Sequence, residues 1–375
     1  MRMNNVVGLI FSNAYDSAIP ELTTLRTMGS VPFGGRYRLI DFVLSNMVNS
    51  GMSKVGVATK SNYQSLMDHL GSGKPWDLSR KNSGMYILPP FSTKDNVGVY
   101  EGMLDALRSN LPYLRSCKEK YVVLSNSFML YSVDFEDMID KHEKSGADIT
   151  LMYTKDPGVR RSGQGKYCEV QPDGQVTQIE VDPLVNRFDN TMTEVFCMSR
   201  EFLISMVDLS TSRGHYHFTR QMLRTGVDNK SLKVNAYECK SRVWAIDSVE
   251  AYYQCSMDLL DPENRASIFP DDRPVLTKLR DEMPTRYAPG ARVSNSLIAD
   301  GCVIEGTVEN CVLFRSVRVG KGAVIRNSIV MQDGRIEPLA EVDHTIMDKQ
   351  SIIRESTRLI GAANYPVLVS KGITV

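Results

Sequence analysis

Residues 310–359 read NCVLFRSVRVGKGAVIRNSIVMQDGRIEPLAEVDHTIMDKQSIIRESTRL, a stretch whose pattern returns after 17 residues. Within each repeat an apolar residue recurs at every sixth position, which gives three apolar columns. The columns are Leu313, Val330 and Met347; Val319, Ile336 and Ile353; and Ile325, Val342 and Leu359. A six-residue step with about three steps per coil is typical of a parallel β-helix built from hexapeptide repeats. Each coil buries its inward side chains against the next, so three to four coils form a small core.

The chain before residue 260 follows another pattern, in which short apolar runs alternate with longer amphipathic stretches. The strand-like runs are 6–11, 55–58, 121–124 and 149–153, and helical spacing covers 38–50, 63–70, 101–115 and 134–145. This alternation predicts a doubly wound α/β domain over residues 1–260, with a mostly parallel sheet and helices on both faces. Ligands in such folds bind beyond the carboxyl ends of the strands.

Between the two patterns, residues 261–291 contain five prolines and many charges, which is typical of a linker. The β-helix is therefore expected over residues 292–375. The ends of a solenoid expose strand edges and apolar surface, and contact with another subunit is one way to cover them.

The composition limits the classes of partner. Lys plus Arg (44) equals Asp plus Glu (44), which argues against a nucleic acid held by bulk electrostatics. No run of about 18 apolar residues is present, so we expect no membrane span, and the N-terminal apolar run is typical of a first strand rather than a signal peptide. Seven cysteines occur singly, without metal-ligand spacing, and we expect buried thiols in a reducing cytoplasm.

Residues 31–51, VPFGGRYRLIDFVLSNMVNSG, carry the most specific motif of the N-terminal region. Together with GSGKPWDL at 71–78, Pro89-Pro90, Tyr100-Glu101-Gly102 and the closing residues 257–260, it resembles the glucose-1-phosphate adenylyltransferase (ADP-glucose pyrophosphorylase) family. The resemblance covers nearly the whole chain. It implies a nucleotidyltransferase-like domain of Rossmann type followed by a left-handed β-helix. Members transfer the adenylyl group of ATP to glucose 1-phosphate, with Mg²⁺ and cationic side chains neutralising the phosphate charge.

The family's nucleotide loop, LAGGxGxRL, corresponds here to residues 11–19, FSNAYDSAI. All three glycines are replaced, and Ala18 stands where the resemblance places an arginine. Met28 stands where a phosphate-facing lysine belongs, and Asp182 replaces the lysine of the FEEKP motif that holds the sugar phosphate. These changes remove positive charge from the path of a phosphate, and Asp16 adds negative charge to it.

Both carboxylates that bind the metal in this family are also missing. The aspartate of the LSGDH motif aligns with Ser127 or Phe128, and that of WKDVGT aligns with Ala245. Asp247 stands two positions on, which returns it to the same face of a strand, whereas Asp134 lies further along the chain from the first position. Losing one preorganised charge-stabilising donor typically costs about 10² to 10³ in rate. We therefore expect little or no activity from this chain alone and no bound cofactor, with Mg²⁺ belonging to a catalytic partner.

Four retained positions are candidates for residual ligand binding: Gly34, Gly35, Tyr100 and Gly102. The glycine pair also suits a tight turn, and Tyr100 and Gly102 also suit a structural role. Three basic groups are candidates for an anionic effector such as a phosphorylated sugar. They are Arg36 with Arg38, Arg160 with Arg161, and Arg315 with Arg318. A solvated surface or salt bridges between subunits explain the same charges.

The histidines carry weaker signals. His215 and His217 have no nearby cysteine or carboxylate to complete a metal site, so we interpret them as surface or interface residues. His344 occupies a repeat position otherwise filled by Asn, and a structural role is the simpler interpretation. An acyltransferase that uses His344 is the alternative, although the long N-terminal domain argues against it.

The sequence thus predicts a pseudoenzyme similar to the non-catalytic, regulatory GlgD-type subunit of the family. The resemblance implies bacterial glycogen biosynthesis and a hetero-oligomer, expected as a heterotetramer, with a catalytic glucose-1-phosphate adenylyltransferase subunit whose rate this chain raises. A homo-oligomer is possible for the isolated chain. Two further alternatives stay open: an active nucleotidyltransferase with relocated metal ligands such as Asp247 and Asp134, and a stand-alone metabolite-binding module.

Overall fold

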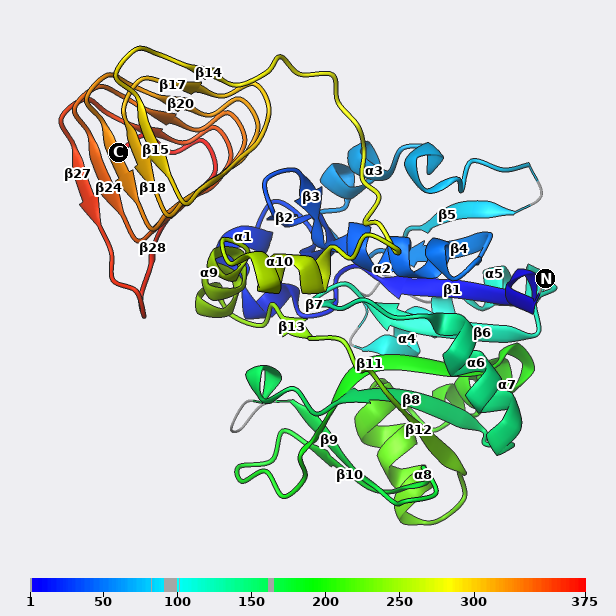
Figure 1. Cartoon of the computed structure of the whole chain (residues 1–375). Coiled ribbons are helices and arrows are strands. Elements are labelled where there is room, and N and C mark those ends of the chain that lie inside the picture. Colours follow the sequence, from blue (N-terminus) through cyan, green and yellow to red (C-terminus); the bar gives the residue numbers. More distant parts are fainter. Residues whose placement is uncertain (1, 82, 91–99, 101, 161–164) are drawn as a thin grey trace.

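A computed structural model of the chain describes residues 2–81, 83–90, 100, 102–160 and 165–375 (Figure 1). An α/β domain is followed by a β-helix, which lies beside the domain next to α1 (Pro20–Thr23) and α9 (Val249–Asp258). Two residues of the sequence motifs, Glu101 and Arg161, lie outside the described residues.

One mixed sheet forms the centre of the α/β domain. Its parallel half has the order β5-β4-β1-β6. These strands are Gly84–Leu88, Lys54–Ala58, Val6–Phe11 and Tyr121–Asn126. They include three of the predicted strand-like runs. The predicted parallel pairing is confirmed for this half, but the expectation of a mostly parallel sheet is wrong, because one long strand of the other half pairs antiparallel with three neighbours, β6 among them.

The other half of the sheet is built around one long strand, β11 (Asn190–Ser199), which runs antiparallel to β6. Strand β8 (Ile149–Thr154), the fourth predicted run, pairs with β11 and is joined in parallel by β12 (Val234–Glu238). The antiparallel hairpin of β9 (Lys166–Val170) and β10 (Val176–Val181) also joins β11. Two short pairs lie outside this sheet: β2 (Pro32–Phe33) with β3 (Tyr37–Arg38), and β7 (Met129–Leu130) with β13 (Trp244–Ala245).

Helices cover both faces of the sheet, as predicted. Val6 and Ile10 of β1 belong to a core that contains α2 (Leu39–Asn49) and α6 (Phe135–Ser145). The alternating residues Val7, Leu9 and Phe11 face a second core. That core contains α4 (Met103–Ser109), α5 (Leu111–Ser116) and α7 (Arg200–Ser212).

One predicted element is wrong as a single helix. The pattern over 101–115 forms two helices, α4 and α5, which meet at Asn110. Pro112 explains the break, because proline lacks an amide hydrogen and is tolerated in the first turn of a helix but not inside one. The remaining helices are α3 (Gln64–Leu70), α8 (Arg224–Asp228) and α10 (Pro262–Ile268), with 3₁₀ turns at Arg2–Asn5, Asp16–Ala18, Met28–Ser30, Lys74–Trp76 and Pro157–Val159 and a π-helix at Phe218–Leu223.

The C-terminal region is the predicted left-handed parallel β-helix, with three five-stranded parallel sheets as its sides. The first sheet contains β14 (Arg286–Tyr287), β17 (Val303–Ile304), β20 (Arg318–Val319), β23 (Arg335–Ile336) and β26 (Ile352–Ile353). The second contains β15 (Arg292–Ser294), β18 (Thr307–Glu309), β21 (Val324–Arg326), β24 (Glu341–Asp343) and β27 (Arg358–Ile360). The third contains β16 (Leu297–Ile298), β19 (Val312–Leu313), β22 (Ile329–Val330), β25 (Thr345–Met347) and β28 (Val367–Val369).

The strand registers confirm all three apolar columns. Val319 pairs with Ile336 and Ile336 with Ile353 in the first sheet, and the other two columns follow the same register in theirs. Strand β14, which lies within the predicted linker, pairs with β17 of the first sheet. The domain boundaries at residues 260 and 292 stay a prediction.

The third sheet is covered by the α/β domain. Outward residues of this sheet, Val312, Ile329 and Ile346, share a hydrophobic core with α2. All seven cysteines are unpaired and buried, as expected. No helix among the described residues is both long and apolar enough to cross a bilayer.

Candidate functional site

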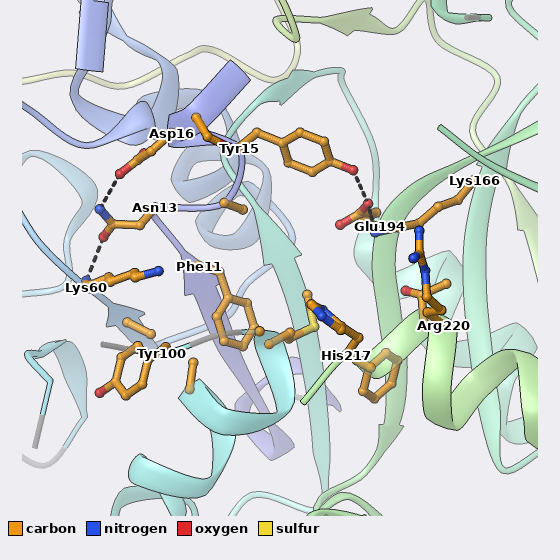
Figure 2. A pocket seen from close by; sticks show the side chains of 18 of the residues that line it. Phe11, Asn13, Tyr15, Asp16, Lys60, Tyr100, Lys166, Glu194, His217 and Arg220 are labelled. Carbon is orange, nitrogen blue, oxygen red and sulfur yellow. Dashed lines mark hydrogen bonds and ion pairs between the residues drawn. The ribbon is translucent and has the colours of Figure 1, made fainter. Parts of the chain in front are cut away.

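A pocket of about 720 Å³ opens beyond the carboxyl ends of β1 and β4, where a parallel sheet is expected to bind its ligand (Figure 2). Five segments line it: the loop after β1, the turn after β4, the start of α4, the strands β9 to β11, and the π-helix at 218–223. Tyr100 and Gly102 both line this pocket, so the structure brings together two of the four candidate ligand residues.

The loop after β1 is closed by its own side chains. One carboxylate oxygen of Asp16 accepts a hydrogen bond from the Met28 amide at 2.7 Å, and the other accepts from the Asn13 side chain at 2.6 Å. Asn13 in turn accepts from the Lys60 amide at 2.7 Å, which fixes the loop to the turn after β4 (Figure 2). Burial raises the pKa of Asp16 to about 6, although its hydrogen bonds act in the opposite direction. The carboxylate therefore holds a place where a bound anion would accept the same hydrogen bonds.

Tyr15 closes the neighbouring part of the loop. Its hydroxyl donates to Glu194 at 2.7 Å, and its ring stacks on Phe128 with centroids 4.0 Å apart. Glu194 also pairs with Lys166. A bulge in β11 directs Glu194 into the pocket: the register shifts between Met192 and Phe196, and Glu194 has φ +58°. Burial and the charge of Glu194 raise the pKa of Tyr15, which keeps it a donor.

Asp182 lies at the pocket wall, where the resemblance places a phosphate-holding lysine. It pairs with Arg220 at 2.8 Å and accepts from the Gly165 amide at 3.0 Å. The Arg220 guanidinium at this position is thus already engaged by a carboxylate.

The positions at which the resemblance places metal-binding carboxylates hold other residues. Ser127 and Ala245 are both buried, and Phe128 packs against Tyr15. Asp247 is close enough for its charge to raise the pKa of Tyr15. Asp134 instead caps α6 by accepting from the Glu136 amide at 3.0 Å and pairs with Arg273 at 3.5 Å.

Among the described residues no group of three or more His, Cys, Asp or Glu side chains could hold a metal ion. Ser127, Phe128 and Ala245 also lack the carboxylate oxygens with which the family is expected to hold Mg²⁺, so the residues at these positions do not fit that ion. Ala18 and Met28, the two other changed positions, lie outside the pocket lining, and Met28 contributes only its amide to Asp16.

Gly34 and Gly35 lie away from this pocket. Both have positive φ, +58° and +84°, and they form the turn between β2 and β3. A side chain is disfavoured there by the backbone conformation, which accounts for both glycines as a turn. Gly35 faces the β-helix, where an added Cβ would lie 3.7 Å from Ala299.

A second, small hollow of about 30 Å³ lies between the α/β domain and the β-helix. We call it the basic cleft, because its charged lining residues are all cationic. They are Arg36, Arg38, Lys278, Arg280, Arg315 and Lys349, with His69 beside them. Three of the predicted effector arginines thus meet here, whereas Arg318 does not line the cleft and Arg160 pairs with Asp189 at 3.0 Å.

Burial and the neighbouring positive charges lower the pKa values of three side chains in the basic cleft. Burial and the charges of Arg38 and Arg26 lower the pKa of Lys349 to about 7. Burial lowers the pKa of Arg38 to about 10, and burial with the charges of Arg280 and Arg36 lowers that of Arg315. The buried Nε of Arg315 has no hydrogen-bond partner among the described residues.

An ion pair connects the β-helix to the segment that follows the nucleotide loop. Arg26 makes two hydrogen bonds to Asp348, at 2.9 and 2.7 Å, and both side chains are only 3% exposed. Asp348 precedes Lys349 of the basic cleft, and Arg26 lies two residues before the Met28 amide that holds Asp16. The segment 26–28 therefore contacts Asp348 of the β-helix through Arg26 and Asp16 of the large pocket through the Met28 amide.

The histidines have ordinary roles. His217 lies at the rim of the large pocket, and His215 does not line it. His344 ends a ladder of side-chain amides formed by Asn295, Asn310 and Asn327 at the corners of successive coils. Like them it has positive φ, and its ring nitrogen lies 2.7 Å from Asp343. This position fits a structural corner residue.

Comparison with known proteins agrees with the geometry. The nucleotidyl transferase family matches residues 19–261, and the GlmU-like C-terminal hexapeptide family matches residues 284–364. The glycogen biosynthesis protein GlgD of Bacillus subtilis (strain 168) is 35% identical over 99% of this chain and 97% of its own length. The GlgD of Geobacillus stearothermophilus is 36% identical over 86% and 83%, and the glucose-1-phosphate adenylyltransferase of that organism is 31% identical over 85% and 83%.

The chain belongs to the glucose-1-phosphate adenylyltransferase and GlgD family of nucleotidyl transferases. The sequence analysis did not predict that the side chains of Glu194 and Lys166 line the pocket. Glu194 and Lys166 reach the pocket only because β11 is bulged and β9 pairs with it.

The buried pair between Arg26 and Asp348 generates a stability prediction. Asp348→Asn leaves a buried guanidinium without its counterion, which is expected to lower the free energy of unfolding by about 3 to 5 kcal/mol. Urea unfolding followed by tryptophan fluorescence measures this loss. The double variant Arg26→Met/Asp348→Leu removes both charges and is expected to regain most of it. A double variant as unstable as the single one would contradict this account of the ion pair.

Proposed function

We propose that this chain is a regulatory, catalytically degenerate subunit of a glucose-1-phosphate adenylyltransferase complex in bacterial glycogen biosynthesis. The complex converts ATP and glucose 1-phosphate to ADP-glucose and pyrophosphate, and this chain activates its catalytic paralogue in a hetero-oligomer. The names of the relatives support a role in glycogen biosynthesis. We place the assembly in the cytoplasm, where the seven buried thiols would stay reduced.

The main support for the proposal is that the family's two-part fold is retained while side chains of the chain itself close the site. The two-part fold matches the family over nearly its full length. In the loop after β1, however, Asp16 adds a carboxylate to the pocket lining, and the Tyr15 hydroxyl is bound to Glu194 across the pocket. An electrostatic site cannot stabilise a polyphosphate transition state when its cations are already neutralised from within. The retained frame therefore supports assembly better than turnover.

Activation of a partner requires a surface on which the two chains meet. The last coil supplies exposed apolar side chains: Ile360 is 51% exposed, Tyr365 73% and Ile373 50%. Its strand β27 is also the end of the second sheet. Contact there would cover an open strand edge and favour one conformation of the partner, which is how binding shifts a population.

Activity assays of separate and mixed subunits test this proposal. The catalytic glucose-1-phosphate adenylyltransferase encoded in the same genome is assayed by pyrophosphate release, alone and with an equimolar amount of this chain. We expect the mixture to exceed the partner alone by about fivefold or more in kcat/KM, the lower range of ordinary coupling between sites. This chain alone is expected to release no pyrophosphate.

Two controls sharpen the result. Asp247→Ala in this chain is expected to leave the activation unchanged, since we assign Asp247 no metal-binding role. If this chain alone releases pyrophosphate and Asp247→Ala abolishes that release, the alternative with relocated metal ligands is established instead. The absence of both co-elution and activation would remove the proposed function.

We also propose that the basic cleft, with a volume of about 30 Å³, takes only the phosphate group of an anionic effector of the phosphorylated-sugar class. Six cations from both parts of the chain converge there, and burial with the neighbouring positive charges lowers the pKa of Lys349 to about 7. An anion would relieve this repulsion and restore the proton of Lys349 at neutral pH. The cleft borders the β-helix at Phe314 and Gln332, so occupancy would tighten the contact between the two parts.

Inorganic phosphate is a sufficient probe of the basic cleft. At constant ionic strength, replacing chloride by phosphate is expected to raise the Tm of the wild-type chain, because a ligand that binds the folded state stabilises it. Arg315→Gln is expected to remove at least half of that rise. Arg318→Gln, on the neighbouring strand but outside the cleft, is the matched control and should keep it. Equal responses of the two variants would place the anion elsewhere.

A further inference from the structure

The large pocket is electrically balanced by its own side chains. Three carboxylates line it, Asp16, Asp182 and Glu194, and the described lysine and arginine residues of its lining are Lys60, Lys166 and Arg220. Lys166 pairs with Glu194 and Arg220 pairs with Asp182. The charge of Lys60 acts on Asp16, whose pKa it lowers against the effect of burial. Among the described lining residues, no net positive charge is left to attract a polyanion.

Three hydrogen-bond donors at or beside the loop are also engaged. The Met28 amide and the Asn13 side chain both donate to Asp16, and the Lys60 amide donates to Asn13. A phosphate group entering the loop would have to displace the Asp16 carboxylate and then lie beside it. Repulsion between two such charges in a partly buried site is costly, because neighbouring charges interact more strongly there than in water.

The space that remains suits an uncharged ligand. The pocket volume of about 720 Å³ is in the range of ordinary small-molecule sites. Phe11, Tyr100 and Phe218 add aromatic rings to the pocket lining. Ser17, Thr59, Ser61 and Thr219 add neutral hydrogen-bonding groups to the same lining. Aromatic rings bind flat bases or sugar faces, and hydroxyl side chains bind hydroxyl groups of a ligand.

We propose that the large pocket binds an uncharged glycosyl compound of nucleoside size and discriminates against its polyphosphate. This inference rests on the proposed function in one respect, since it takes the pocket to be a binding site without turnover. Binding of such a ligand would occupy the space between the loop after β1 and the π-helix at 218–223, which both line the pocket. The ligand would thus act as a signal molecule, not as a substrate.

Calorimetry on the full chain with three probes tests the proposal. The probes are adenosine, methyl α-glucoside and ATP without divalent metal, each in the same buffer. Adenosine is expected to bind at least tenfold more tightly than ATP. Methyl α-glucoside tests whether a sugar or a nucleoside is recognised. If it binds more tightly than adenosine, the sugar is the recognised part.

Variants locate the site and test its electrostatic basis. Ala14→Trp fills the pocket from the loop and is expected to abolish adenosine binding. Asp16→Asn/Asp182→Asn removes two carboxylates and is expected to reduce the preference for adenosine over ATP by at least tenfold. Asp208→Asn, in an exposed pair with Arg115 outside the pocket, is the matched control and should change neither affinity. Thermal unfolding of each variant establishes that it is folded.

Two outcomes would overturn the inference. One is ATP binding as tightly as adenosine in the wild-type chain, and the other is no binding of either uncharged probe. Neither outcome bears on whether the chain activates a catalytic partner, because that is measured separately by pyrophosphate release from the mixture. Failure of activation with intact adenosine binding would remove the regulatory role and leave the pocket assignment standing.

Discussion

The Asp16 carboxylate is the interaction on which the site depends. It accepts hydrogen bonds from the Met28 amide, at the start of η3 (Met28–Ser30), and from the Asn13 side chain. Asn13 accepts in turn from the Lys60 amide, so the loop after β1 is joined to the turn after β4. In a phosphate-binding loop such donors are left for the ligand. Here they are satisfied within the chain. The loop is therefore stable without a ligand, at the expense of the charge complementarity that a polyphosphate requires.

The same segment is tied to the β-helix. Two residues before the Met28 amide, Arg26 makes its buried pair with Asp348, and apolar residues of the third sheet share a core with α2. The segment 26–28 thus lies between the loop after β1 and the β-helix and contacts both. This arrangement offers a physical route by which an anion in the cleft and a partner on the solenoid could influence the same loop.

The sequence predicted the features that come from periodicity. All nine column residues of the β-helix have their predicted partners, because a six-residue step leaves one inward position per side of the coil. The parallel strands and the helices on both faces were predicted for the same reason. The pattern over 101–115 was continuous across Pro112, so the break into two helices was missed.

Contacts between distant segments were not predictable in this way. Glu194 enters the pocket because of a bulge, and Arg26 meets Asp348 across 322 residues of sequence. The basic cleft combines Arg38 with Arg315 and Lys349, and no local pattern relates these positions. The changed family positions were visible in the sequence, whereas the self-closure of the loop by Asp16 required the fold.

The most direct measurement of the central claim is a crystal structure of this chain grown with ATP and Mg²⁺. The account predicts that Asp16 still accepts from the Met28 amide, that Tyr15 still reaches Glu194, and that no divalent ion is bound in the large pocket. A structure in which a metal ion bridges the ATP phosphates and protein carboxylates would contradict it.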